Sequence, residues 1–291
     1  MKPTYSQPLT MLVCLAHPDD ETFGMGGTLA LYARRGVEVH LVCATRGDVG
    51  EMDPELLKGF GSIAERRESE LRCAAQILGL TGVYFLGYRD SGMPGTTDNE
   101  HPNALAAQPT DEVAAKVEHY IRRLKPQVVV THDPIGGYKH PDHIAMHKAT
   151  LRALELAADP SFTNDLPPYR PNKVYYQTMP KDLLRWAVRI APLLGMDPHH
   201  FGRNRDIDLA TVVKEGNFPT HARINCHSVG DIRDEATACH SSQLGGAIGR
   251  KGPMAFLRRY FGMTETFMRA YPPPENSLRE RDLFEGVDGC G

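Results

Sequence analysis

Two short polar segments of this chain combine histidine and aspartate in a pattern typical of metal sites. The first, residues 17–21, reads His-Pro-Asp-Asp-Glu and directly follows an apolar run. Pro18 restricts the backbone of His17 to an extended form, so that a turn beginning there can direct His17 and Asp20 to one point. Asp19 would then point elsewhere, free to accept a proton. Taken alone, the segment is equally a strand-to-helix connection in which an aspartate caps the helix.

The second segment, residues 136–143, reads Gly-Gly-Tyr-Lys-His-Pro-Asp-His. We expect His143 at the start of a helix that Asp142 caps. The two histidines, His17 and His143, and the carboxylate of Asp20 leave one coordination position open, which is typical of a catalytic rather than a structural zinc site. Nitrogen and oxygen ligands suit Zn²⁺, and Fe²⁺ uses the same set of two histidines and one carboxylate.

Two further histidines lie close to this ligand set in the sequence. His147 would share a helix face with His143 and is the rival ligand. We prefer a packed or exposed helical histidine at this position, because three protein ligands are already available. His132, at the end of a predicted strand, is interpreted either as a residue that orients the ligands or as a structural one.

Apolar patterns along the chain predict the elements that must bring these segments together. We expect strands at 11–16, 37–44, 83–86, 127–131 and 173–177, and helices at 28–35, 63–78, 111–124 and 142–157. This alternation predicts an α/β fold, with a Rossmann-like, mostly parallel twisted sheet and helices on both faces. Such sheets bind ligands beyond the carboxyl ends of their strands. Both polar segments are expected there.

The second half of the chain is less regular. We expect helices at Trp186–Leu194, Asp231–Gln243 and Gly262–Ala270, and a strand at His221–His227. The stretch Ser91–Pro109 is interpreted as a long functional loop. We expect one domain over residues 1–291, with a core at 10–180 and an extension at 181–291 that packs on the core and borders the site.

Composition excludes several classes of protein. The 291 residues are 41% hydrophobic and 24% charged, as in ordinary globular proteins. The formal net charge of -3 gives no reason to expect nucleic acid or an anionic membrane as a partner. The first apolar run is too short for a signal peptide or a membrane span. The basic pairs are interpreted as solvated helix faces, namely Arg66-Arg67, Arg122-Arg123 and Arg258-Arg259.

The cysteines contribute little to the sequence analysis. The chain has six, which form no C-x-x-C pair and do not indicate a disulfide pattern. Cys14 and Cys43 lie in strand patterns, where a thiol acts as a small buried apolar group. A reducing cytoplasm is the simplest expected location.

Taken together, the two polar segments resemble the signatures of a known enzyme family. A-H-P-D-D-E at Ala16–Glu21 and H-P-D-H at His140–His143 are similar to the paired motifs of the PIG-L/LmbE-like zinc deacetylases. The similarity covers most of the chain, and Arg89–His143 most resembles the mycothiol branch, which includes a deacetylase and a conjugate amidase. It implies hydrolysis of the acetamide of an N-acetylglucosamine conjugate to acetate and the free amino sugar. The alternative is cleavage of a larger amide in a glucosamine-thiol conjugate.

The resemblance also implies roles for individual residues: zinc ligands His17, Asp20 and His143, catalytic residues Asp19, Tyr138, His140 and Asp142, and substrate-binding residues Asp90, Arg46 and His240. Asp19 would be the general base towards water whose pKa zinc lowers to about 7. His140, oriented by Asp142 and with its pKa raised by that carboxylate, would be an acid or an electrostatic stabiliser. Tyr138 would help to polarise the carbonyl. The leaving amine could be protonated by His140 or by protonated Asp19.

The implied substrate contacts are less specific. Asp90 would hold sugar hydroxyls, and His240 belongs to a late motif, His-Ser-Ser-Gln, that borders the active site of the family. Arg46 corresponds only loosely to the substrate-binding loop after the second strand. The expected partner is a small amino-sugar substrate, and the sequence leaves a homo-oligomer open.

Two other classes of function compete with this interpretation. An Fe²⁺ oxygenase would fit the ligand set alone, but Asp19 supplies a hydrolase with its base. A nucleotide-binding module could use Gly24-Met25-Gly26-Gly27 as a phosphate loop. Leu29, however, occupies the place of the third glycine of G-x-G-x-x-G. Both alternatives are therefore disfavoured.

Overall fold

The computed structural model describes residues 8–162, 165–178, 208–216, 218–243, 264–275 and 277–287, together with 185, 188–194, 197 and 199. They form a seven-stranded sheet in the order β3-β2-β1-β4-β5-β7-β6. The strands are β1 (Thr10–Leu15), β2 (Glu38–Thr45), β3 (Gly82–Tyr88), β4 (Val128–Thr131), β5 (Lys173–Thr178), β6 (Ala222–Asn225) and β7 (Thr264–Tyr271). β1 to β5 pair in parallel, and β7 is antiparallel to both of its neighbours. The predicted mostly parallel α/β sheet is confirmed.

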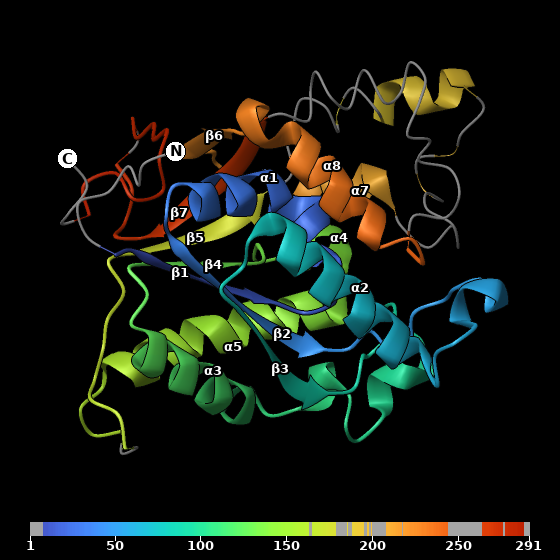
Figure 1. Ribbon diagram of the computed structural model, residues 1–291, viewed down its shortest axis with the longest axis horizontal. Helices are drawn as coiled ribbons and strands as arrows, with labels where there is room; N and C mark the ends of the chain where they lie inside the picture. The colour runs from blue at the N-terminus through green and yellow to red at the C-terminus, as the bar shows by residue number, and fades with distance from the viewer. Residues whose placement is uncertain are drawn as a thin grey trace.

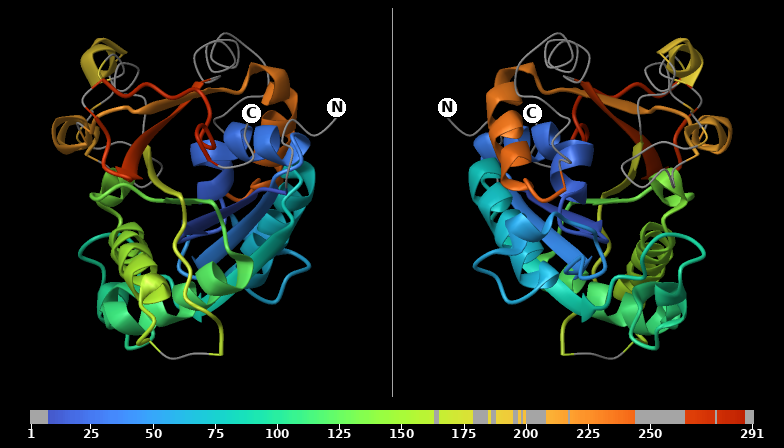
Figure 2. Two further views of the ribbon diagram at one scale, coloured as in Figure 1. Left: turned by 90° about the vertical axis from the view of Figure 1, so that its left-hand side faces the viewer. Right: turned by 90° about the vertical axis from the view of Figure 1, so that its right-hand side faces the viewer.

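Helices cover both faces of the sheet (Figure 1). The described helices are α1 (Asp20–Arg34), α2 (Ile63–Leu78), α3 (Thr110–Leu124), α4 (Gly136–Lys139), α5 (Pro141–Ala158), α7 (Leu209–Glu215) and α8 (Gly230–Cys239). Short 3-10 turns lie at Pro54–Leu57, Thr97–Glu100, Leu105–Ala107, Ala191–Leu194 and His227–Val229. α1, α2 and α8 cover one face, and α3 and α5 cover the other. The side views in Figure 2 show the same layers.

The apolar run of β1 explains why the sheet is covered twice. All six residues of β1 are buried. Because successive side chains of a strand point to opposite faces, Met11, Val13 and Leu15 join the core beneath α1 and α2. Leu12 and Cys14 join the second core, beneath α3 and α5. The end of β1, where the first polar segment begins, is thus fixed from both sides.

Two helix starts differ from those predicted. α1 begins at Asp20 rather than at residue 28, so the glycine-rich stretch lies inside the helix, with non-helical angles at Met25. A Cβ on Gly27 would lie 2.6 Å from the Cβ of Cys226, so the glycine allows the strand-end residue Cys226 to pack directly on α1. α5 is capped by His140, whose side chain accepts the N–H of Asp142, and the prediction of Asp142 as the cap is wrong.

The second half of the chain corrects further predictions. The segment 264–271 is strand β7, between β5 and β6, so the predicted helix at 262–270 is wrong. Its Thr, Phe and Tyr residues favour a strand, and its ladders to two neighbouring strands overcome the helix-forming Glu, Met and Ala. Helix α8 ends at Cys239, four residues before the predicted end. Of the predicted helix at 186–194, Trp186 and Ala187 lie outside the described residues.

β6 and β7 belong to the sheet itself, beyond β5, and do not form a separate layer on the core. Glu265 of β7 accepts the backbone N–H groups of Gly27 and Thr28 at 2.9 and 2.7 Å, which ties the extension to the kinked part of α1. Among the described helices, none combines the length and the apolar character that a membrane span requires.

A disulfide joins Cys73 of α2 to Cys239 at the end of α8, across 166 residues of sequence. Cys14, Cys43 and Cys226 are free and buried. The sequence did not indicate this pair, because only the packing of α8 on α2 brings the two residues together. Disulfides are typical of oxidising compartments, so this one does not support the cytoplasmic location predicted above.

We predict that replacing both Cys73 and Cys239 by serine lowers the free energy of unfolding by about 2–4 kcal/mol, because the cross-link restricts the unfolded chain. Urea unfolding with and without dithiothreitol checks this. The reductant should destabilise the wild type and leave the double variant unchanged. Equal thiol titres of the denatured wild type before and after reduction would contradict the bond.

Candidate metal centre and active site

The two polar segments meet at the carboxyl ends of neighbouring strands. β1 and β4 are paired in parallel, with Cys14 opposite Thr131, so the residues that follow each strand emerge side by side. His17 and Asp20 follow β1, and His143 lies in the first turn of α5, shortly after β4. This is the switch point of the sheet, where ligands bind in open α/β folds.

Three donor groups converge on one point there. His17 Nδ1 lies 3.2 Å from His143 Nε2. The Asp20 carboxylate has Oδ1 at 3.2 Å from His143 Nε2 and Oδ2 at 3.6 Å from His17 Nδ1. Donors around a tetrahedral zinc with bonds of about 2.0–2.1 Å are about 3.3–3.4 Å apart. The predicted ligands His17, Asp20 and His143 are therefore brought together at the spacing that such an ion requires.

The charges of these groups also fit a cation. Although burial opposes a charged ring, Asp90 and Asp142 raise the pKa of His17 well above its ordinary value. Burial likewise opposes ionisation of Asp20, but His143 and His132 lower the pKa of this carboxyl well below its usual range. Buried carboxylates thus favour a positive charge at this point, which a divalent ion would also provide.

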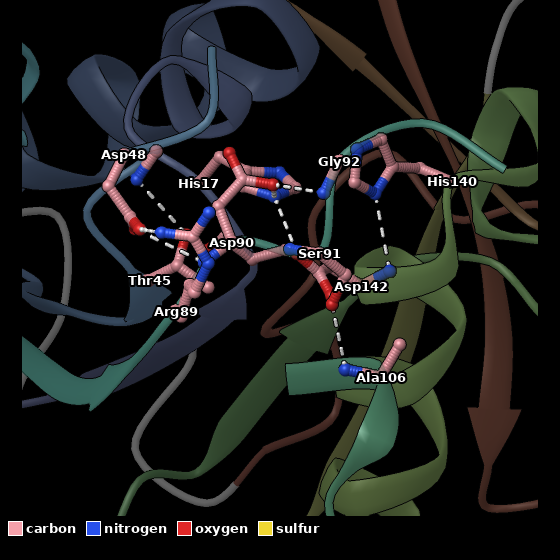
Figure 3. A network of polar contacts seen from close by, with 12 residues as sticks. His17, Thr45, Asp48, Arg89, Asp90, Ser91, Gly92, Ala106, His140 and Asp142 are labelled. Atoms are coloured by element: carbon pink, nitrogen blue, oxygen red, sulfur yellow. Dashed lines mark hydrogen bonds and ion pairs between the residues drawn. The ribbon is translucent and has the colours of Figure 1, made fainter. Parts of the chain in front are cut away.

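The Asp142 carboxylate orients His17, as Figure 3 shows. Its Oδ2 lies 3.1 Å from His17 Nε2 and accepts the backbone N–H of Ser91 at 2.9 Å, and its Oδ1 accepts the Ser91 hydroxyl. With Nε2–H donated to Asp142, the lone pair of His17 Nδ1 faces His143 and Asp20. Metal-binding histidines are commonly held in this way by a carboxylate. The predicted orientation of His140 by Asp142 therefore does not come from the carboxylate, which bonds His17.

His140 is held by the backbone instead. Its Nδ1 accepts the N–H of Asp142 at 3.2 Å, which leaves the ring proton on Nε2. Burial, and then His17 and His143, lower the pKa of His140 far below its ordinary value. The predicted rise of this pKa is therefore wrong, because the carboxylate of Asp142 faces His17. A neutral His140 can donate a hydrogen bond through Nε2 but is a poor proton donor.

Two other histidines pack next to the proposed ligands: His132 contacts His143, and His147 bonds His132. His132 stacks on His143 with ring centroids 4.0 Å apart, and its Nε2 accepts the N–H of Ala16 at 3.1 Å. That lone pair is thus occupied, although His132 also lies close to Asp20. His147 Nδ1 bonds the carbonyl of His132 at 2.8 Å. His147 is packed against Tyr176, as the preferred interpretation of the sequence had it.

Asp19 has an unusual backbone, and its side chain does not cap α1. Its φ is 115°, in the left-handed region that residues with a side chain rarely adopt, and its carboxylate makes no cap hydrogen bond to the helix. It points instead to Arg67, whose Nη2 lies 3.1 Å from Oδ2. Burial raises the pKa of Asp19 to about 6, against the opposing effect of Arg67. Backbone strain and a shifted pKa together are typical of functional residues.

Arg67 is a residue of this site to which the sequence analysis gave no role. It is 5% exposed and also donates to the carbonyls of Pro18 and Gly47, at 2.7 and 3.2 Å. A Cβ on Gly47 would lie 2.0 Å from Arg67, so the glycine makes room for it. The interpretation of the basic pairs as solvated is wrong for Arg67 and also for Arg122, which is 1% exposed. In these two pairs the buried member lies on the apolar helix face, a signal the sequence contained. The third pair, Arg258-Arg259, lies outside the described residues.

Tyr138 belongs to the second polar segment and lies on the short α4. Its ring centroid is 5.3 Å from that of His143 and 5.8 Å from that of His140. Burial raises the pKa of Tyr138 above its ordinary value, so the hydroxyl stays protonated as a donor. A Cβ on Gly136, at φ 66°, would lie 2.9 Å from the Cβ of His143. The glycine therefore allows α4 to fold closely over His143.

The predicted substrate-binding residues lie in three different places. Asp90 is beside the ligands, with Oδ1 3.6 Å from His17 Nε2 and Oδ2 4.0 Å from Arg67. Arg46 pairs with Glu68 at 2.6 Å and lines a cavity of about 470 Å³ on the β2–β3 side, which also includes Asp48, Arg89 and Lys116. The structure thus brings Asp90, but not Arg46, into the ligand cluster.

His240 is buried, with 0% exposure, and its Nε2 lies 2.7 Å from Oε1 of Glu21. Burial disfavours the charged ring, but Glu21 raises the pKa of His240 above its ordinary value. A residue without exposed surface does not contact a substrate. The prediction of His240 as a substrate-binding residue is therefore wrong for this conformation, although its motif does border the site.

Solved structures of similar fold do not all share one chemistry. The N,N'-diacetylchitobiose deacetylase from Pyrococcus horikoshii has a TM-score of 0.61 and 23% identity, over 89% of this chain and 83% of that one. The 4-carboxy-2-hydroxymuconate hydratase from Pseudomonas putida KT2440 has a TM-score of 0.58 and 20% identity, over 93% and 99% of the two chains. These likenesses show the fold alone.

Sequence comparison is more specific. The family model described as PIG-L, GlcNAc-PI de-N-acetylase, matches residues 12–154, which include both polar segments. The 1D-myo-inositol 2-acetamido-2-deoxy-alpha-D-glucopyranoside deacetylase of Kineococcus radiotolerans is 43% identical over 308 residues, covering 97% of this chain and 84% of that protein. The predicted family is confirmed, and the chain belongs to the PIG-L family of de-N-acetylases.

Proposed function

We propose that the protein hydrolyses the acetamide of an N-acetylglucosaminyl inositol, releasing acetate and the free amino sugar. The observation that carries the proposal is the convergence of His17, Asp20 and His143 at metal-binding distances beside the uncoordinated carboxylate of Asp19. The inositol conjugate is proposed because relatives that match nearly the whole chain are named for it.

We propose Zn²⁺ as the metal, held by His17 Nδ1, Asp20 and His143 Nε2. When bound, zinc would polarise the acetamide carbonyl and lower the pKa of a water to about 7. Two nitrogens and one oxygen also suit Fe²⁺, so metal analysis of the purified protein must identify the native ion.

The protein groups around this point divide the proton chemistry between them. Asp19 takes a proton from the attacking water, and a cation beside it would lower its pKa and keep it ionised. Tyr138 and the Nε2–H of His140 donate to the carbonyl oxygen as negative charge develops there. Because His140 is neutral, we propose that Asp19 then gives its proton to the amine nitrogen as the C–N bond breaks.

The substrate contacts form the remaining part of the proposal. Asp90, next to His17, would accept hydrogen bonds from sugar hydroxyls, and the cavity that Arg46 lines would receive a more distant part of the substrate. Because β6 and β7 complete the sheet, we propose one catalytic domain over residues 1–291. A cytoplasmic location stays part of the proposal and requires the Cys73–Cys239 bond to persist among cellular thiols.

We predict that the purified protein releases acetate from N-acetylglucosaminyl inositol, and that a chelator abolishes this activity until Zn²⁺ is added back. A panel with other N-acetylglucosamine conjugates, and with a glucosamine conjugate that carries a bulkier acyl group, measures the preference. Faster cleavage of the bulky amide would show an amidase instead. If no acetamido sugar is hydrolysed by metal-loaded protein, the proposed function is wrong.

Replacing Asp19 and replacing His143 should impair different properties of the protein, namely turnover and metal binding. We predict that Asp19→Ala lowers kcat by at least about 10²-fold, the usual contribution of a general base, with the metal content of the wild type. His143→Ala should lose the metal, because only two protein ligands remain. Kinetics and metal analysis of both variants check this. Full turnover by Asp19→Ala would show that Asp19 is not the base. Full metal content of His143→Ala would show that His143 is not a metal ligand.

The Asp142 carboxylate should strengthen metal binding, because it orients His17. We predict that Asp142→Asn weakens metal affinity about 10–100-fold, as expected for a residue that orients a ligand. The control is Asp98→Asn, which removes a carboxylate paired with Arg89 without contact to the ligands. Competition with a chelator of known affinity measures both variants. Unchanged affinity in Asp142→Asn would show that His17 is oriented without this carboxylate.

A further inference from the structure

The side chain of Glu21 links the base to a distant part of the chain. It follows Asp20 in α1 and is fully buried. Its Oε2 accepts the backbone N–H of Asp19 at 2.9 Å, and its Oε1 bonds His240 Nε2 at 2.7 Å and the hydroxyl of Thr22. One carboxylate therefore connects the residue before α1 to the residue after α8.

The backbone conformation of Asp19 determines where its carboxylate points, so a hydrogen bond to its N–H can fix that direction. In most helices an aspartate at the cap position turns its side chain to the helix N–H groups. At Asp19 the left-handed backbone, with φ 115°, leaves the carboxylate free of that role, and it bonds Arg67 beside the ligands instead. A left-handed residue with a Cβ is unfavourable by itself and persists only when its surroundings hold it. The bond from Glu21 Oε2 is such a contact, made directly to the strained residue.

His240 is itself held firmly. The disulfide fixes Cys239, the residue before it, to α2. After it, the backbone N–H and hydroxyl of Ser242 donate to the buried carboxylate of Glu70 on α2, at 2.9 and 2.6 Å. The backbone is therefore fixed to α2 both before and after His240, and this holds the imidazole that bonds Glu21 in place.

We propose that Glu21 and His240 are positioning residues of the deacetylation reaction, which hold Asp19 in the left-handed conformation that directs its carboxylate to the site. The inference rests on the proposed function, since it assumes that Asp19 is the base. It assigns the late His-Ser-Ser-Gln motif a role that acts through Glu21 rather than by contact with the substrate.

Glu21→Gln tests the proposal with little change of volume. The amide keeps one oxygen and presents an NH₂ donor in place of the other, so that either Asp19 N–H or His240 Nε2–H loses its acceptor. We expect kcat to fall about 10–100-fold, as for a catalytic group displaced by about 1 Å. KM should change less than about twofold, and metal content should equal that of the wild type, because substrate and metal contacts are retained.

Glu265→Gln is the matched control. Glu265 is a partly buried carboxylate that, like Glu21, accepts backbone N–H groups of α1, from Gly27 and Thr28, but it does not touch Asp19. Both variants should lower Tm. Only Glu21→Gln should lower kcat beyond about twofold, so that a general loosening of α1 is separated from displacement of the base.

Variants of His240 complete the test. His240→Gln retains an N–H donor for Glu21 and should keep most of the wild-type kcat, whereas His240→Leu leaves the carboxylate without this partner and should resemble Glu21→Gln. A double-mutant cycle with Asp19→Ala adds a readout of mechanism. Once the base is removed, Glu21→Gln should lower the residual rate less than about twofold.

The outcomes separate this inference from the proposed function. Wild-type kcat in Glu21→Gln, an equal loss in Glu265→Gln, or the full effect of Glu21→Gln on the Asp19→Ala background would each overturn the positioning role. Full turnover by Asp19→Ala, or failure of the wild type to release acetate, would instead overturn the function on which it rests.

Discussion

The approach of two imidazoles and a carboxylate to within 3.2–3.6 Å of one another is the interaction on which the rest of this structure depends. Groups that would otherwise each need water or a partner are buried together at the end of the sheet. Such an arrangement is costly unless charge is balanced. The surrounding carboxylates of Asp90 and Asp142 make a positive charge favourable at the same point, and a divalent ion would satisfy all of these groups at once.

The fold delivers this arrangement by simple means. β1 and β4 are adjacent and parallel, so two short segments more than a hundred residues apart emerge beside each other. A second set of residues then fixes the direction of each functional side chain: Asp142 for His17, the Asp142 N–H for His140, Arg67 for the Asp19 carboxylate and Glu21 for the Asp19 backbone. These contacts come from α1, α2 and α5, and His240 in the turn after α8 holds Glu21 in turn. The C-terminal part thus contributes to the catalytic geometry from a distance.

The convergence of His17, Asp20 and His143 and the parallel sheet could be predicted from the sequence, because each depends on local patterns. His17 and Asp20 sit in one short turn after an apolar strand, and His143 follows another strand. The orientation of side chains could not be predicted in the same way. Aspartate is a preferred helix-cap residue, which favoured Asp142 as the cap of α5. The structure uses His140 instead, and this leaves the Asp142 carboxylate to bond His17.

Long-range contacts explain the remaining errors. The segment 264–271 contains residues that suit a helix or a strand, and the ladders to β5 and β6 decide between them. The helical spacing of Arg67 with Leu71 and Leu78 could have indicated that it is buried, but its contact with Asp19 depends on how α2 lies on the sheet. Likewise, the contact of Glu21 with His240 and the pairing of Cys73 with Cys239 require α8 to lie on α1 and α2.

The most direct test of this account is anomalous diffraction at the zinc absorption edge from crystals of the zinc-loaded protein. The account places a single strong peak about 2.0–2.2 Å from His17 Nδ1, His143 Nε2 and a carboxylate oxygen of Asp20, with Asp19 left uncoordinated. A peak bound instead through His132 or His147, or through Asp19, would contradict it.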